Sequence, residues 1–87
     1  MSDEERLVQI KTRMGLDGNS YNDALIKELI TDVMGDLRDL GISEETLHSS
    51  SSLGVIATGV KDLWQNNPSE TKYSQYFYDR ADRLRRK

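Results

Sequence analysis

The chain has 87 residues, no cysteine and a net charge of −3. A chain of this length forms one small domain that buries only about 60 to 65% of its unfolded surface, and without cysteine it can hold no disulfide, thiol nucleophile or thiolate metal site. No apolar run reaches the roughly 20 residues of a membrane span, and residues 1–10 lack the apolar segment of a signal peptide, so we expect a soluble intracellular protein.

The charge is distributed unevenly along the chain. Residues 1–45 contain eleven acids and five bases, a net charge of −6, whereas residues 46–87 contain four acids and seven bases, a net charge of +3. Such asymmetry suggests head-to-tail association or an anionic partner. The alternative interpretation is that these charges belong to solvated helix faces.

Helical periodicity dominates the sequence. Ser2 and Glu5 have the spacing of a capping box, which predicts a first helix over residues 3–14 that ends at glycines. Residues 21–40 have apolar side chains over about 180° of the helix surface, wider than the roughly 100° stripe of a helix with one packed face. This segment is therefore predicted to be a long central helix with neighbours on two sides. Its remaining face carries Glu28, Asp32 and Asp39.

Residues 41–52 are predicted to be a loop, with Gly41 ending the preceding helix and the serines available to cap the next one. That next helix, over residues 51–65, has one apolar face, from which Val55 points away. Gly54 and Gly59 each cost this helix about 1 kcal/mol relative to alanine. Either another backbone approaches closely at these glycines or the helix bends.

Pro68 ends that helix, because proline disfavours helical structure at the residue before it. Ser69 or its neighbour can cap a last helix that continues to about residue 85. The spacing throughout predicts an all-α fold, a small bundle of about four helices with a long central helix, in a single domain over residues 1–87.

The last helix carries a concentration of aromatic rings. At 100° per residue, Tyr73, Tyr76 and Phe77 share one side, and Tyr78 lies about 140° from Tyr73. We expect Tyr73 and Phe77 to face the core and Tyr78 to face outward beside Arg85. An exposed tyrosine among arginines is typical of a protein interface, and a solvated tyrosine is the alternative.

The sequence has no pattern typical of a catalytic or metal site. His48 has no second histidine at ligand spacing and is expected to be a solvated loop residue, and the serines at 49–52 lack the pattern of a phosphate-binding loop. Three acids at i, i+4 spacing lack the loop geometry of calcium sites; they are Glu28, Asp32 and Asp36. We expect no catalytic residue, no metal and no cofactor, in a protein that is not an enzyme.

Five positive charges within residues 80–87 offer a few phosphate contacts for nucleic acid. However, the connection over residues 41–50 is much longer than the turn of a helix-turn-helix motif, and the whole chain is acidic, whereas dedicated DNA-binding domains are usually basic. Cations at a helix C-terminus also complement the helix dipole. Sequence-specific DNA recognition is therefore not favoured.

The second half of the chain, SLGVIATGVKDLWQNNPSETKYSQYFYDRADRLRR, resembles the closing segment of the small phage head-tail connector, or adaptor, proteins, also described as DNA-packaging proteins. In that family an apolar helix ending in an aromatic residue is followed by a short loop with proline and asparagine, and then by a helix with a tyrosine and leucine rhythm that Tyr73, Tyr78 and Leu84 roughly follow. The segments LVQIKTRMGLD and YNDALIKELI resemble the start of the family. Residues 41–52 have no counterpart there.

This resemblance implies a structural protein of the virion. It would assemble as a homo-oligomeric ring beneath the portal at the head-tail junction, extend the DNA channel and dock stopper or tail-completion proteins. Genomic DNA would pass without sequence-specific binding, and the protein would reside in the host cytoplasm before assembly.

Two groups of residues are predicted to form its interfaces. A portal interface is expected at Tyr78, Arg83, Arg85, Arg86 and Lys87. A face that meets basic residues of a neighbouring subunit, or lines the channel, is expected at Glu28, Asp32 and Asp39. Two other functions remain open: a small DNA-binding packaging or regulatory accessory protein that uses the basic C-terminal helix, and a helical interaction module with no viral role.

Overall fold

A computed structural model of the protein describes residues 2–16, 22–65 and 72–86. Within these ranges the chain forms five α-helices and one short 3-10 helix, and no strand occurs there. The elements are α1 (Asp3–Arg13), α2 (Asp23–Asp39), α3 (Glu44–Leu47), η1 (Ser50–Ser52), α4 (Leu53–Trp64) and α5 (Gln75–Arg85). The predicted all-α fold is confirmed.

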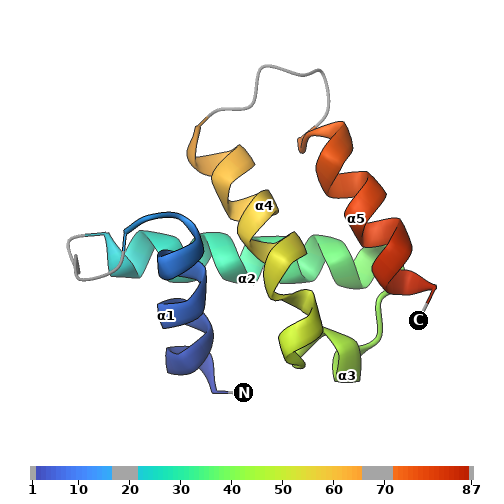
Figure 1. Ribbon diagram of the computed structural model, residues 1–87, viewed down its shortest axis with the longest axis horizontal. Coiled ribbons are helices and arrows are strands. Elements are labelled where there is room, and N and C mark those ends of the chain that lie inside the picture. Colours follow the sequence, from blue (N-terminus) through green and yellow to red (C-terminus); the bar gives the residue numbers. More distant parts are fainter. Residues whose placement is uncertain (1, 17–21, 66–71, 87) are drawn as a thin grey trace.

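The helices form two layers. Figure 1 shows α2 crossing behind α1, α4 and α5, and the molecule measures 34 × 31 × 17 Å, so that its short dimension is close to two stacked helices. The most enclosed helix is α4, which packs against α1, α2 and α5. Because α4 is covered on several sides, Val55 is buried, and the expectation that it points away from the core is wrong.

Local signals set the ends of α1 and α2. The Ser2 hydroxyl accepts a hydrogen bond from the backbone N–H of Glu5 at 3.1 Å, as the capping pattern predicts. At the end of α2, Gly41 has φ +98°, its N–H donates to the Arg38 carbonyl at 3.0 Å, and the N–H of Ile42 donates to the Leu37 carbonyl at 3.2 Å. These two bonds form a Schellman motif, which confirms Gly41 as the residue that ends the helix.

The predicted loop at residues 41–52 is instead structured. The Ser43 hydroxyl accepts from the N–H of Thr46 at 3.2 Å and so caps α3, a four-residue helix that is too short to show a periodic pattern. Ser52 precedes α4 but makes no capping bond, because its buried hydroxyl donates to the Leu47 carbonyl at 2.8 Å. The segment brings Leu47 and Ile42 into the core.

The last helix starts later than predicted. Its cap is Ser74, whose hydroxyl accepts from the N–H of Phe77 at 3.3 Å, and Tyr73 therefore precedes the helix. Both Tyr73 and Phe77 are buried as expected, and their rings stack with centroids 4.0 Å apart. Pro68 and Ser69, the residues to which the sequence assigned the break and the cap, lie outside the described residues.

The two glycines of α4 are sites of close approach, by side chains rather than by another backbone. A Cβ atom on Gly59 would lie 2.8 Å from the Phe77 ring and 2.8 Å from a Val33 methyl group. A Cβ atom on Gly54 would lie 2.2 Å from the guanidinium of Arg80. Gly59 thus lets α2 and α5 pack tightly on α4, and Gly54 makes room for an arginine.

Candidate functional site

The arginines of α5 separate into two groups on different sides of the helix. At 100° per residue, Tyr78, Asp82, Arg85 and Arg86 fall within about 100° of one another, whereas Tyr76, Arg80 and Arg83 fall within about 60° of one another on another side. We call the first group, with Leu40, the Tyr78 face. We call the second group, with Ser51, the Arg80 face. The predicted portal residues are therefore divided between two faces, and Lys87 lies outside the described residues.

The Tyr78 face is partly closed. Tyr78 is half-buried, its ring edge-on to Phe77 at 5.4 Å between centroids, so it does not face outward as the sequence suggested. It lines a shallow pocket of about 170 Å³ that also includes Leu40 and Arg85. Asp82 holds Arg85 at 2.7 Å and Arg86 at 2.9 Å, so both guanidinium groups already have a carboxylate partner.

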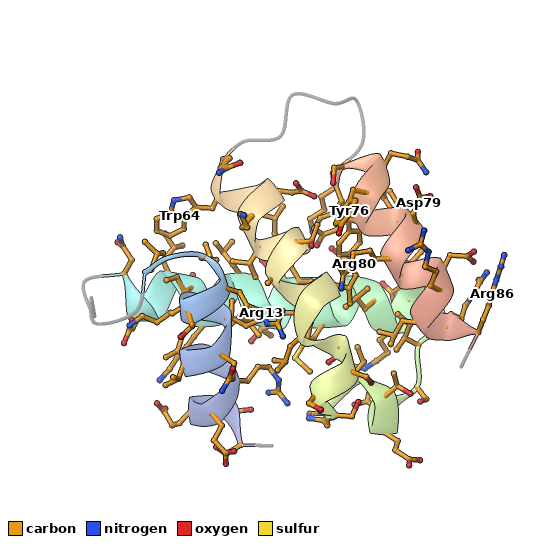
Figure 2. The ribbon with its side chains drawn as sticks, viewed as in Figure 1. Arg13, Trp64, Tyr76, Asp79, Arg80 and Arg86 are labelled. Carbon is orange, nitrogen blue, oxygen red and sulfur yellow. The ribbon has the colours of Figure 1, made fainter. Side chains whose placement is uncertain are left out.

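The Arg80 face carries the exposed ring of α5. Tyr76 is 58% exposed, although the helical pattern placed it on the packed side. Its hydroxyl accepts a hydrogen bond from Arg80 Nη1 at 2.8 Å, and the Arg80 guanidinium carbon lies 5.5 Å from the ring centroid (Figure 2). Arg80 and Arg83 line a hollow of about 290 Å³ with Ser51. In the described residues neither arginine has a carboxylate partner.

Sequence reasoning missed Tyr76 and Arg80. Their spacing of four residues is a signal for contact on one helix face, and Gly54 is a signal that something bulky packs against the start of α4. Nothing in the sequence links these two signals, because the register of α5 on α4 decides which side chain reaches Gly54.

The acidic residues predicted on the central helix do share one surface. Glu28, Asp32 and Asp39 fall within about 40° of one another on α2 and lie about 170° from the middle of its core-facing side. We call this group the acid stripe. All three side chains are exposed, and within the described residues none has an ion-pair partner.

Asp36, on the same helix, has a different role. Its carboxylate lies 2.8 Å from Lys72 Nζ and accepts a hydrogen bond from the Tyr73 hydroxyl. Burial opposes ionisation of Asp36, but the hydrogen bonds from Lys72 and Tyr73 outweigh burial and lower its pKa. Burial and the neighbouring Asp36 charge raise the pKa of Tyr73 well above its ordinary value. This cluster joins the start of α5 to α2.

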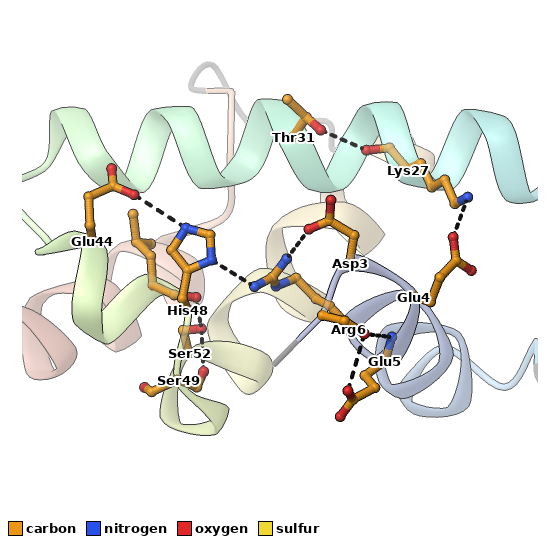
Figure 3. A network of polar contacts seen from close by, with 12 residues as sticks. Asp3, Glu4, Glu5, Arg6, Lys27, Thr31, Glu44, His48, Ser49 and Ser52 are labelled. Carbon is orange, nitrogen blue, oxygen red and sulfur yellow. Dashed lines mark hydrogen bonds and ion pairs between the residues drawn. The ribbon is translucent and has the colours of Figure 1, made fainter.

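A basic groove lies where α1, α2 and α3 meet. It has a volume of about 390 Å³ and a floor of Ile30 and Met34. Arg6, whose side chain is only 4% exposed, donates to Asp3 at 3.0 Å and contacts His48 Nδ1 at 3.0 Å (Figure 3). Because an arginine can only donate, Nδ1 of His48 accepts this bond.

The other cations of the groove are also held by carboxylates. Lys27 lies 2.9 Å from Glu4, Arg38 pairs with Glu44, and His48 Nε2 lies 3.3 Å from Glu44. With Nδ1 as acceptor, Nε2 carries a hydrogen and directs it toward Glu44. His48 is therefore a bridge between α1 and α3 rather than the solvated loop histidine that the sequence suggested. The groove is internally compensated.

Among the described residues, no three histidine, aspartate or glutamate side chains gather as metal ligands. None of the helices in these ranges is long and apolar enough to cross a membrane. Comparisons with protein-family models, with curated proteins and with solved structures found no match to this chain. The surfaces with uncompensated charge are therefore the features on which function can be argued.

Proposed function

We propose that the protein is a structural head-tail connector, or adaptor, of a phage or prophage. It assembles as a ring beneath the portal, extends the DNA channel and docks stopper or tail-completion proteins. The proposal is supported by the resemblance of residues 7–17, 21–30 and 52–86 to that family. The structural observation that carries it is that acids on α2 and arginines on α5, on separate surfaces, have no ion-pair partner within the described residues. Such surfaces favour association with complementary partners.

In this proposal the Tyr78 face contacts the portal. It combines a half-buried aromatic ring, the apolar Leu40 and the guanidinium group of Arg85 around one shallow pocket, and Arg86 is tied to the same face through Asp82. Aromatic and arginine side chains are enriched at the energetically important centres of interfaces. The acid stripe either meets basic residues of the next subunit or lines the channel, where its negative charge would keep DNA from adhering.

Co-sedimentation with portal-bearing capsids tests the proposal. We expect the protein to bind such capsids and the variant Arg85→Gln with Arg86→Gln to bind about tenfold or more weakly, because interface arginines are frequent hot spots. Arg13→Gln removes an exposed, unpaired arginine on α1 and is the control (Figure 2). A truncation after Asp79 would also remove Arg85 and Arg86, but it is unsuitable as a test because it would remove Ala81 and Leu84 from the core. A protein that does not bind the capsids at all would contradict the proposal.

One observation favours a second function, a small DNA-binding packaging or regulatory accessory protein. Arg80 and Arg83 have no carboxylate partner in the described residues and are free to contact phosphates. The net charge of −3 and the acid stripe oppose this function. Binding to random duplex DNA that falls steeply with salt would favour it. A stable monomer with affinity for neither capsid nor DNA would indicate a helical interaction module.

A further inference from the structure

We infer that the Arg80 face is the docking surface for the acid stripe of a second copy of this chain. The inference rests on the proposed function and deepens it, because it names the two surfaces through which neighbouring subunits meet. It also removes the choice left open for the acid stripe, which then belongs to the contact between subunits rather than to the channel.

Across the described part of the chain, the charges of these two surfaces lack ion-pair partners, unlike most of those around them. Most cations near these surfaces already have a carboxylate within the chain: Lys27 pairs with Glu4, Lys72 with Asp36, and Arg85 with Asp82. Within residues 2–16, 22–65 and 72–86, Arg80 and Arg83 have no such partner, and the three acids of the acid stripe have no cation partner.

Asp79 does not change this result. It lies four residues before Arg83, a spacing at which an ion pair can form, but no such pair occurs among the described residues, and its carboxylate accepts a hydrogen bond from Gln75 Nε2 at 3.0 Å. Within that part of the chain both guanidinium groups of the Arg80 face therefore lack a carboxylate partner, and Arg80 donates only to the uncharged Tyr76 hydroxyl.

The two surfaces lie on different layers of the molecule. The acid stripe lies on the side of α2 opposite its core-facing residues, which include Val33. On α4, Gly59 packs against Val33 of α2, and Gly54 lies beneath Arg80. These two glycines are about 140° apart around the helix. The acid stripe thus faces away from the layer that carries the Arg80 face. Figure 1 shows α2 behind that layer, and Figure 2 shows Tyr76 and Arg80 between α4 and α5.

Surfaces arranged in this way cannot pair within one molecule. They can pair between copies in a head-to-tail arrangement, which closes into a ring when the rotation between copies permits it. A second copy is therefore the occupant that the positions of these charges favour.

The two surfaces have similar lengths. On the Arg80 face, Tyr76 and Arg83 are seven residue steps apart along α5, or about 10.5 Å, with Arg80 between them. On α2, Leu25 is 46% exposed and lies within about 60° of Glu28. Leu25 and Asp32 are also seven residue steps apart, with Glu28 three steps after Leu25. With the two helices parallel, Tyr76 covers Leu25 and Arg83 meets Asp32. Arg80, four steps after Tyr76, then reaches Glu28 across a difference of one residue, about 1.5 Å.

A charge exchange between Arg83 and Asp32 tests the inference. Both side chains are exposed and form no ion pair with another described residue, so reversing either one leaves the core intact. Arg80 is left unchanged, because its guanidinium packs against Gly54. The variants are Arg83→Glu, Asp32→Lys and the double variant, whose net charge equals that of the natural chain. Arg13→Glu is the control, since it changes the net charge by the same amount as Arg83→Glu.

Self-association is measured by sedimentation at about 0.01 M salt, where the screening length is about 30 Å. The natural chain is expected to associate, and each single reversal to weaken association about tenfold or more, because like charges then face each other. The double variant should regain association, and Arg13→Glu should behave as the natural chain. Circular dichroism verifies that each variant is folded.

Three results would overturn the inference. The first is a natural chain that stays monomeric at about 1 mM, a concentration at which even a dissociation constant in the millimolar range gives dimers. The second is self-association that neither single reversal weakens, and the third is a double variant that does not regain self-association. A loss of duplex DNA binding as the only effect of Arg83→Glu would favour the accessory-protein function instead.

The outcome is separable from that of the capsid experiment. Recovery in the double variant without capsid binding would support the paired surfaces and contradict the connector function. Capsid binding with normal ring assembly by Arg83→Glu would support the connector function and contradict the paired surfaces.

Discussion

At the scale of single residues, Asp36 shows how one carboxylate joins two helices. It accepts hydrogen bonds from Lys72 and Tyr73, and the Tyr73 side chain is only 2% exposed. The pKa of Asp36 is lower in the folded protein than the value of about 3.9 typical of an unfolded chain. Its contribution to stability is therefore fully present above about pH 4 and is lost as the pH falls through the lower folded value.

Tyr73 has the opposite sign. Its pKa is raised in the folded protein, because the phenol is buried beside the Asp36 charge. The contribution of the neutral phenol is therefore fully present below about pH 10 and is lost as the pH rises toward the folded value.

Replacing Tyr73→Phe should separate these contributions. We expect the free energy of unfolding at neutral pH to fall by about 1 to 2 kcal/mol, because a buried hydrogen bond to a charged group is lost. The variant should also lose less stability than the natural chain below about pH 4 and above about pH 10, since Asp36 is then less perturbed and the phenol is absent. Urea unfolding across this pH range measures both effects.

Tyr76→Phe is the matched control, because its ring is exposed and its hydroxyl contacts only Arg80 among the described residues. It should change stability by no more than about 0.5 kcal/mol. An unchanged pH profile in Tyr73→Phe would show that Asp36 is not held by this hydroxyl.

At the scale of elements, the sequence predicted more of the helices than of their contacts. Periodicity and caps located α1, α2 and α4 to within a few residues, because each is long enough to show its apolar face. The four residues of α3 cannot show a period. Tyr78 was misplaced because its angle of about 140° from Tyr73 holds only if both residues lie on the last helix. Tyr73 instead precedes α5, and Tyr78 lies beside Phe77 and lines a pocket with Leu40 at the end of α2.

The glycines of α4 allow a test of packing between elements. At Gly59 a new Cβ atom would lie 2.8 Å from both Phe77 and Val33. At Gly35, in the interior of α2, a new Cβ atom would have nothing within 4 Å. The same substitution should therefore have opposite effects at these two helical positions.

We expect Gly59→Ala to destabilise the protein by about 1 to 2 kcal/mol, because overpacking costs more than the gain in helix propensity. Gly35→Ala should stabilise it by about 0.5 to 1 kcal/mol through the lower backbone entropy of the unfolded chain. Thermal and urea unfolding of the two variants provide the measurement. Stabilisation by both alanines would mean that α2 and α5 do not approach α4 as closely as described.

At the scale of the whole molecule, the sequence predicted an all-α protein and a stripe of acids on α2. It did not predict that the arginines of α5 divide into two faces, because that division depends on how α5 packs. Arg80 reaches Gly54 on α4, while Arg85 reaches Asp82 and the region of Leu40. The functional surfaces are thus a product of tertiary packing that periodicity alone does not contain.

The same packing makes α4 the centre of cooperativity. It contacts α1, α2 and α5 and buries six of its twelve residues, whereas α3 buries only Leu47. An amide in α4 can exchange only when its neighbours separate, which requires global unfolding, expected to cost roughly 4 to 13 kcal/mol for a domain of this size. An amide in α3 can exchange through local opening of one turn.

Native-state hydrogen exchange should therefore rank the helices. Amides of Ile56, Ala57 and Val60 in α4 should be the slowest, with a denaturant dependence equal to that of global unfolding. The amide of Leu47 in α3 should exchange at least about tenfold faster, a difference of about 1.4 kcal/mol in opening free energy, with little dependence on denaturant. Slower exchange in α2 than in α4 would contradict this ranking. It would show that α2, the longest helix, opens last and is the centre of cooperativity.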